Sequence, residues 1–262
     1  MLRRRKKNPK PDHRPARGPV AAPAVSARRR ARTDAVVPPE LVIRPGVGGG
    51  VVLVTGFEPF GGETSNPSWE ICRMLPGTIG PMRVETLRVP CEFGRAIDVV
   101  AAAIERHRPA LVVCIGQAGG RAHMSVERVA INVDDARAPD NAGAQPIDDP
   151  IAGDGPPAYF ATLPIKAMTA AMRRAGAPTE VSNSAGTYVC NHLMYGVLHF
   201  IAAGGFDARA GFIHVPYAEA QVVDKAGVAG MSLATMARGV EAGIAAATAH
   251  ARDIAVSEGA IA

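Results

Sequence analysis

The chain has 262 residues, 47% of them hydrophobic, which is enough to bury the core of a single α/β domain. Its net charge of +5 comes from one end of the chain, because residues 1–48 hold 13 of the 29 Lys and Arg but only 3 of the 24 Asp and Glu. The positive net charge therefore gives no support for a nucleic-acid enzyme. No segment approaches the roughly 20 apolar residues of a membrane span, and none of the four cysteines lies in a C-x-x-C pair, which disfavours a membrane protein, a zinc knuckle and a redox motif.

Residues 1–48 form a Pro- and Arg-rich extension that is predicted to be disordered, because it has too little apolar area to offset the entropy lost on folding. Such a segment could bind RNA, DNA or anionic lipid. It could equally be an unstructured appendage, or the result of a translation start assigned too early. Residues 49–262 are expected to form one folded domain, and the widely spaced thiols favour a reducing, cytoplasmic location.

From residue 51 the chain alternates between strand and helix patterns. Short β-branched runs or period-two alternation predict strands at 51–56, 83–89, 111–115, 124–133, 211–215 and from Val181. Apolar residues three and four apart predict helices at 93–106, 165–174, 189–201 and 233–249. Gly176 would end the second helix and Ser232 would cap the last. This alternation favours a three-layer α/β/α single domain with a mixed, largely parallel twisted sheet.

Three glycine-rich or polar segments interrupt this scaffold where strands are predicted to end: residues 55–68, 116–121 and 182–192. In open α/β sheets ligands bind at such positions. None of the segments has the glycine spacing of a P-loop or of a dinucleotide-binding turn. We therefore expect chemistry that uses no cofactor.

Cys190 is the best candidate for a nucleophile. It follows a small, polar loop and is predicted in the first turn of a helix, where free backbone N–H groups stabilise a thiolate. The alternative is a buried core cysteine. That interpretation suits Cys114, which lies inside an apolar strand, and Cys72, which lies in a helical pattern.

A cysteine nucleophile needs a base that can later protonate a leaving amine, and histidine suits both steps. Seven histidines compete for this role. His214 interrupts the apolar strand GFIHVPY near its end, whereas His107 and His250 end helices. His192 is two residues past Cys190 and therefore on a different face of the helix. Spacing alone leaves a structural role for His214 as the commoner interpretation.

A third residue, a carboxylate or an amide, should orient the imidazole. Glu127 is the odd charge inside the apolar segment MSVERVAINV. The pattern does not exclude a simple ion pair between Glu127 and Arg128 or Arg121. Asp134 and Asp135, in the following loop, are competing candidates.

Four long segments together closely resemble the pyroglutamyl peptidase I family, also called pyrrolidone-carboxylate peptidases. They are VLVTGFEPFGGETSNPS, GQAGGRAHMSVERVAINVDDARAPDNAGAQPIDDPI, VSNSAGTYVCNHLMYG and GFIHVPY, and the likeness spans roughly residues 51–252. The resemblance implies a cysteine peptidase that removes an N-terminal pyroglutamyl residue from peptides. It further implies that Cys190 in TYVCNH is the nucleophile, Glu127 in ERVAIN the acidic member and His214 in FIHVPY the base.

The resemblance also implies a pocket for the lactam ring, with Phe57 and Phe60 on either side of the ring and Gln117 and Arg137 nearby. Pyroglutamate is neutral and flat at its amino end, so aromatic walls suit it, whereas a charged α-ammonium would be costly to desolvate. Without the resemblance, both phenylalanines would be interpreted as core residues of a turn. A homotetramer without metal or cofactor is implied as well. Two departures from the family pattern are the 48-residue extension and Ala138, where a larger aliphatic residue is usual.

Two other functions stay open from the residues alone. One is a thiol amidohydrolase that uses the same three side chains on lactams or small amides. The other is a nucleic-acid or membrane binder in which the basic extension acts and the enzyme site is idle.

Overall fold

The computed structural model of the chain describes residues 41–42 and 49–258. The predicted disorder of residues 1–48 and the boundary at residue 48 therefore lie outside the described residues, with one exception. Leu41–Val42 form strand β1, which pairs antiparallel with β4 (Met82–Val89). In the described part of the chain, no helix is both long and apolar enough to cross a bilayer.

The strands form a mixed, mostly parallel sheet in the order β1-β4-β2-β5-β10-β6-β9, with β3 (Thr78–Ile79) also on β4. The remaining members are β2 (Val51–Phe57), β5 (Leu111–Gln117), β6 (Met124–Glu127), β9 (Thr179–Ser182) and β10 (Arg209–Val215). Strands β4, β2, β5 and β10 run parallel, β6 runs antiparallel to β10, and β9 runs parallel to β6. This confirms the predicted fold class.

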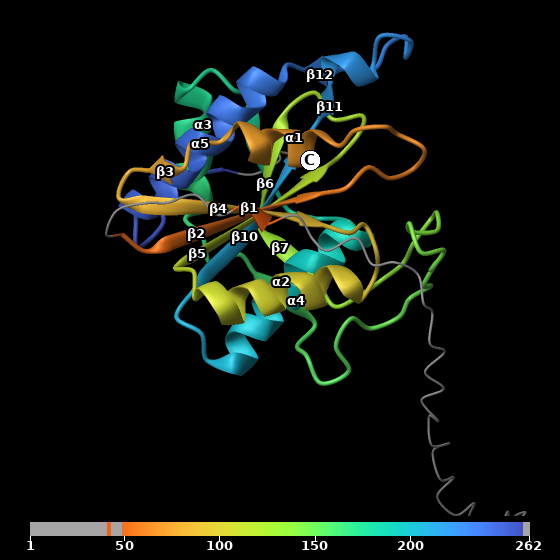
Figure 1. Cartoon of the computed structure of the whole chain (residues 1–262), viewed down its shortest axis with the longest axis horizontal. Helices are drawn as coiled ribbons and strands as arrows, with labels where there is room; N and C mark the ends of the chain where they lie inside the picture. Colours follow the sequence, from red (N-terminus) through yellow and green to blue (C-terminus); the bar gives the residue numbers. More distant parts are fainter. Residues whose placement is uncertain (1–40, 43–48, 259–262) are drawn as a thin grey trace, which may run out of the picture. The chain divides into compact units, whose positions relative to one another are not determined.

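Five helices in the described residues cover the two faces of the sheet (Figure 1). One face carries α1 (Pro67–Met74), α3 (Ile165–Arg174) and α5 (Leu233–Ala249), and the other carries α2 (Arg95–His107) and α4 (Val189–Gly204). The separation into two faces follows from the strand period of two, which sends alternate side chains into opposite layers. In β10, for example, Ile213 packs under α5 and Phe212 packs under α4.

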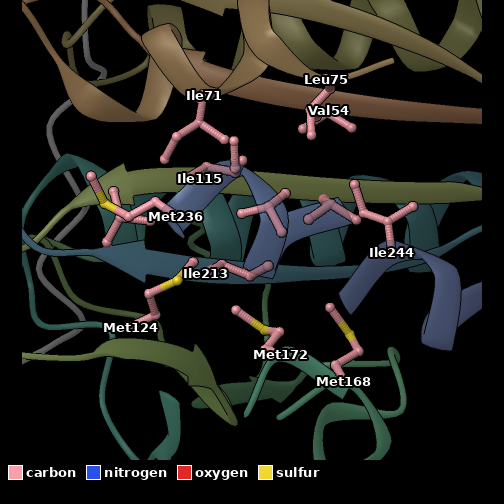
Figure 2. Close-up of a cluster of buried hydrophobic side chains, with 14 of the residues drawn as sticks. Val54, Ile71, Leu75, Ile115, Met124, Met168, Met172, Ile213, Met236 and Ile244 are labelled. Atoms are coloured by element: carbon pink, nitrogen blue, oxygen red, sulfur yellow. The ribbon is translucent and has the colours of Figure 1, made fainter. Parts of the chain in front are cut away.

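The core beneath α1, α3 and α5 is built from aliphatic side chains and methionines (Figure 2). Ile115 and Ile213 come from neighbouring strands, Met168 and Met172 from α3, and Ile244 from α5, and each is almost completely buried. Unbranched methionines adapt to irregular gaps between helices and a twisted sheet. This rigid layer supports the strands whose opposite face carries the candidate site.

The predicted helices are confirmed, with Ser232 accepting a hydrogen bond from the Thr235 N–H at the start of α5. Helix α1 was given no bounds from the sequence, although Cys72 was placed in a helical pattern. Its start is encoded locally, because the Asn66 side chain caps it and Pro67 occupies its first turn. The single strand predicted over 124–133 is wrong in one respect. The chain turns at Arg128, and β7 (Val129–Ile131) leaves the main sheet to pair with β8 (Ala158–Phe160).

Candidate active site

The carboxyl ends of β2, β5 and β10 meet at one edge of the sheet, because these strands are parallel neighbours. Two of the three glycine-rich segments follow β2 and β5 and so lie at this edge, as predicted. The third segment follows β9, which runs in the opposite direction to β10. It contributes to the same site because it leads into α4, whose first turn carries Cys190.

Cys190 and His214 lie over the same face of the sheet, beside one glycine. In the parallel register of β5 and β10, His214 pairs with Gly116, and side chains at paired positions point to the same face. The Sγ atom of Cys190 lies against this glycine, since a methyl group at Gly116 would be 2.9 Å from the sulfur and 2.7 Å from Phe212 Cζ. The absence of a side chain at Gly116 therefore leaves the space that the sulfur occupies, one strand away from the imidazole.

Glu127 holds the imidazole from the neighbouring strand. His214 Nδ1 lies 2.7 Å from Glu127 Oε1, and both side chains are buried. Burial by itself raises the pKa of Glu127, but the hydrogen bond and charge of His214, with hydrogen bonds from Ser182 and Arg121, outweigh it and hold that pKa below its ordinary value. The ionised carboxylate can only accept, so Nδ1 of His214 is the donor and Nε2 is left as the acceptor.

Burial and the neighbouring charges oppose the preformed thiolate that was expected at the helix start. Burial raises the pKa of the Cys190 thiol well above its ordinary value, and Cys91 and the negative charge of Glu127 raise it further, against a smaller lowering effect of Arg121. The partial charge of the first turn of α4 does not overcome desolvation here. Cys190 is nevertheless the only one of the chain's four cysteines that is partly exposed.

Asn191, the residue after Cys190, fixes the start of α4. Asn191 is completely buried; its amide donates to the carbonyls of Ile131 and Val133 and accepts from the Ile131 N–H, at 2.9 to 3.0 Å. Tyr188, the N-cap residue, adds no side-chain hydrogen bond to the first turn. The early N–H groups of α4 therefore stay uncapped by that side chain while the turn itself is held in place.

His192 is excluded as the base by its contacts. Its Nδ1 lies 2.7 Å from Asp134 Oδ2, and its Nε2 accepts the Gly94 N–H at 2.7 Å, so both ring nitrogens are occupied. The same contact removes Asp134 as a partner for His214, and Asp135 is exposed. Of these three carboxylates, Glu127 is the one that contacts His214.

The two phenylalanines of GFEPFGG lie on the side of the sheet covered by α4. Phe57 is buried, with its ring centroid 6.4 Å from that of Phe212, and Phe60 is partly buried, with its ring 6.3 Å from that of Tyr188. Phe212 in turn lies 4.8 Å from the His214 ring. The aromatic rings thus follow the edge from the end of β2 to the start of α4.

Gln117 and Arg137 differ from the phenylalanines in their setting. Gln117 follows Gly116 in β5, so its side chain points to the opposite face, where its Oε1 accepts from Gln221 Nε2 at 3.1 Å. Arg137 is exposed. Contact of the Gln117 side chain with a ligand at Cys190 is therefore disfavoured, whereas the Gln117 backbone remains at the site edge.

Comparison with known proteins identifies the family. The pyroglutamyl peptidase family model matches residues 51–250. The chain belongs to the pyroglutamyl peptidase family. It is similar to the pyrrolidone-carboxylate peptidases of Erwinia tasmaniensis, with 51% identity over 210 residues (80% of this chain and 98% of the relative), and of Cupriavidus pinatubonensis, with 55% over 205 residues (78% and 95%).

Solved structures of pyroglutamyl peptidases agree with this fold. The crystal structure of pyroglutamyl peptidase I from Bacillus amyloliquefaciens matches with a TM-score of 0.78 and 41% identity, over 80% of this chain and all of that one. Pyrrolidone carboxyl peptidase from Thermococcus litoralis matches with a TM-score of 0.76 and 38% identity, over 79% and 99%. The chain is thus a cysteine peptidase of the pyroglutamyl peptidase family.

Asn191, beside the candidate nucleophile, was not singled out in the sequence. It carries a signal that can be recognised in retrospect, because a side chain with so many hydrogen-bonding groups at the start of an apolar helix needs buried partners. Gln221, which bonds to Gln117 on the opposite face and to the Ser65 carbonyl, carries no such signal, since these partners come from segments about 100 and 156 residues away in the chain.

Proposed function

We propose that this chain hydrolyses the peptide bond that follows an N-terminal pyroglutamyl residue, through a thioester on Cys190. Membership of the pyroglutamyl peptidase family supports the substrate class. The observation that carries the assignment of residues is the contact between His214 and Glu127 beside Gly116, against which the sulfur of Cys190 lies.

The first half of the reaction forms the acyl-enzyme. His214 Nε2 removes the thiol proton of Cys190 as the sulfur attacks the carbonyl carbon of the pyroglutamyl residue, because the thiol is not ionised beforehand. The new S–C bond gives a tetrahedral oxyanion, which the uncapped N–H groups of the first turn of α4 can accept, with help from Arg137. The C–N bond then breaks, and the imidazolium gives its proton to the departing amine.

The second half uses water. With the amine gone, His214 Nε2 takes a proton from a water molecule, which attacks the thioester carbonyl, and the C–S bond breaks as the proton returns to the sulfur. Glu127 accepts the hydrogen bond from Nδ1 throughout and stabilises the imidazolium of both halves. The products are free pyroglutamate and a peptide shortened by one residue.

Selectivity for pyroglutamate follows from desolvation in the proposed pocket. Phe57 and Phe60 supply apolar walls, and the Gln117 backbone supplies polar groups at the edge of the sheet. A lactam enters such a pocket at little cost. An ordinary charged N-terminus would lose its hydration there, and none of the proposed binding residues Phe57, Phe60, Gln117 and Arg137 offers it a carboxylate. Assembly as a homotetramer remains a prediction from the resemblance, and a cytoplasmic location remains a prediction from the widely spaced thiols.

The test is a comparison of anilide substrates. Wild-type protein should hydrolyse a pyroglutamyl anilide and show at most traces of activity on alanyl and prolyl anilides with a free amino group. Cys190→Ser should lose the activity, and Cys72→Ala, which removes a buried thiol from the opposite face, should keep it. No turnover by the wild type, equal turnover of the free-amino substrates, or an active Cys190→Ser variant would contradict the proposal.

A further inference from the structure

The same oxygen of Glu127 that binds His214 also binds an arginine. Arg121 Nη1 lies 2.8 Å from Glu127 Oε1, and His214 Nδ1 lies 2.7 Å from it. The carboxylate is completely buried, while about 30% of the Arg121 side chain is exposed. The sequence left two interpretations of Glu127, a carboxylate that orients the imidazole and an ion pair with Arg121, and in the structure the same oxygen makes both contacts.

The position of Arg121 lets its positive charge act both on the Glu127 carboxylate and on the Cys190 sulfur. Arg121 lies in the segment that follows β5, four residues beyond Gln117, and so enters from the edge where the strands end. The negative charge of Glu127 opposes ionisation of the Cys190 thiol, and the positive charge of Arg121 favours it. At the Cys190 sulfur, the positive charge of Arg121 therefore offsets the negative charge of Glu127, the carboxylate that binds the imidazole.

We propose that Arg121 is a positioning residue for the reaction: by sharing Glu127 Oε1 with His214 it fixes the carboxylate against the imidazole, and it compensates the buried negative charge as the thiolate forms. The part of this role that concerns catalysis rests on the proposed function. Exposed ion pairs usually contribute little, but here one partner is wholly buried, so removal of the cation leaves a buried carboxylate with the imidazole as its only ionic partner.

A matched control is available next to Glu127 in the chain. The Arg128 side chain donates to Asn183 Oδ1 and to the Glu258 carbonyl, both at 2.8 Å, and these contacts do not involve Glu127. Arg128→Met removes the same charge close to the site without touching the Glu127 carboxylate. Arg121→Met removes the proposed interaction, and Arg121→Lys keeps a charge but loses the planar guanidinium.

Two measurements test the proposal. The first is kcat and KM with a pyroglutamyl anilide: Arg121→Met should lower kcat about 10- to 100-fold with little change in KM, Arg121→Lys should recover part of the loss, and Arg128→Met should resemble the wild type. The second is the rate at which iodoacetamide alkylates Cys190, followed by mass spectrometry of the Cys190 peptide. This rate should fall in Arg121→Met at constant pH and stay unchanged in Arg128→Met.

The alkylation rate needs no substrate, so it separates this inference from the proposed function. If the wild type fails to hydrolyse the anilide, a slower alkylation in Arg121→Met still supports the electrostatic role of Arg121. If Arg121→Met, with an unchanged thermal midpoint, alkylates like the wild type, the inference is overturned whatever the substrate. A loss of kcat that Arg128→Met shares equally would overturn it too. Should Arg121→Met not fold, the same comparison is made with Arg121→Lys, which should alkylate Cys190 more slowly than the wild type.

Discussion

The sulfur of Cys190 lies directly over Gly116, at a separation that only a residue without a side chain permits. Because Gly116 is also the partner of His214 in the register of β5 and β10, one glycine sets the place where the nucleophile and the base meet. The site thus depends on a strand position that contributes no functional group of its own.

Gly116→Ala is expected to inactivate the protein while leaving it folded. The added methyl group would lie 2.9 Å from Cys190 Sγ and 2.7 Å from Phe212 Cζ, so one of them must move. Overpacking of this kind costs about 1 to 3 kcal/mol, and a displacement of the sulfur by ~1 Å costs roughly 100-fold in rate. Anilide turnover and urea unfolding measure the two effects. Gly153→Ala, at an exposed site where a methyl group has no close neighbour, is the control; equal activity of the two variants would contradict the account.

Glu127→Gln should keep the fold and lose turnover by about 100- to 10,000-fold, because the amide supports the wrong imidazole tautomer and cannot stabilise the imidazolium. Glu180→Gln serves as the matched change, since Glu180 is half-exposed and pairs with His123 at the surface. Steady-state kinetics on a pyroglutamyl anilide give the comparison. A Glu127→Gln variant with more than about a third of wild-type activity would be incompatible with the proposed role.

The same carboxylate should contribute to stability in a defined pH range. The folded pKa of Glu127 is held below its ordinary value of 4.5, so its contribution is complete above about pH 4.5 and is lost as the pH falls through the folded value. Urea unfolding midpoints between pH 7 and pH 3 should therefore fall more steeply for the wild type than for Glu127→Gln. Parallel curves would show that the carboxylate is not held ionised by its partners.

Alkylation of the resting protein should report a protonated sulfur. Cys190 is the partly exposed cysteine, and burial raises its pKa above the ordinary value of 9.0. Iodoacetamide should modify Cys190 before Cys72, Cys91 and Cys114, and the rate should keep rising above pH 9. A rate that reached its plateau below neutral pH would instead indicate a preformed thiolate. The Cys190→Ser protein gives the background for the other three thiols.

His192 and His214 should differ in what their loss affects. His214→Ala removes the base and should abolish turnover with little change in stability, whereas His192→Ala breaks the links to Asp134 and to the Gly94 N–H and should mainly destabilise the fold, by about 1 to 3 kcal/mol. Kinetics and urea unfolding of the two variants side by side distinguish them. Comparable residual turnover in the two variants would contradict the assignment of His214 as the base and of His192 as a structural residue.

Much of this fold could be predicted from local patterns, because strand and helix periods in an alternating α/β chain are read over short windows. The helix at Ile165–Arg174 has the predicted bounds, and its end before Gly176 follows from that glycine's positive φ. The break at Arg128 could not be predicted, since the apolar run continues through it. The Arg128 N–H makes the last hydrogen bond to β9, at the Ser182 carbonyl, and the chain then leaves the main sheet to pair with β8, a partner about 30 residues further along.

The residues predicted for the site come together in the fold, but the charges and contacts around them could not be predicted from the sequence. Cys190, His214 and Glu127 could be named because each is chemically out of place in its segment and because the motifs resemble a family. The raised pKa of the Cys190 thiol depends on burial, and the shared use of Glu127 Oε1 depends on where Arg121 lies. Neither the burial nor this contact can be read from residue spacing. The resemblance places Gln117 near the ligand, and strand alternation leaves its backbone for that role, because the side chain points to the other face.

The most direct test of the central claim is chemical trapping of the acyl group. Wild-type protein mixed with a pyroglutamyl anilide and quenched in acid within the first turnovers should yield a Cys190 peptide that carries one pyroglutamyl group as a thioester, and the same peptide from His214→Ala should be unmodified. Release of the aniline with the acyl group on another residue, or with Cys190 unmodified and dispensable for turnover, would contradict the account.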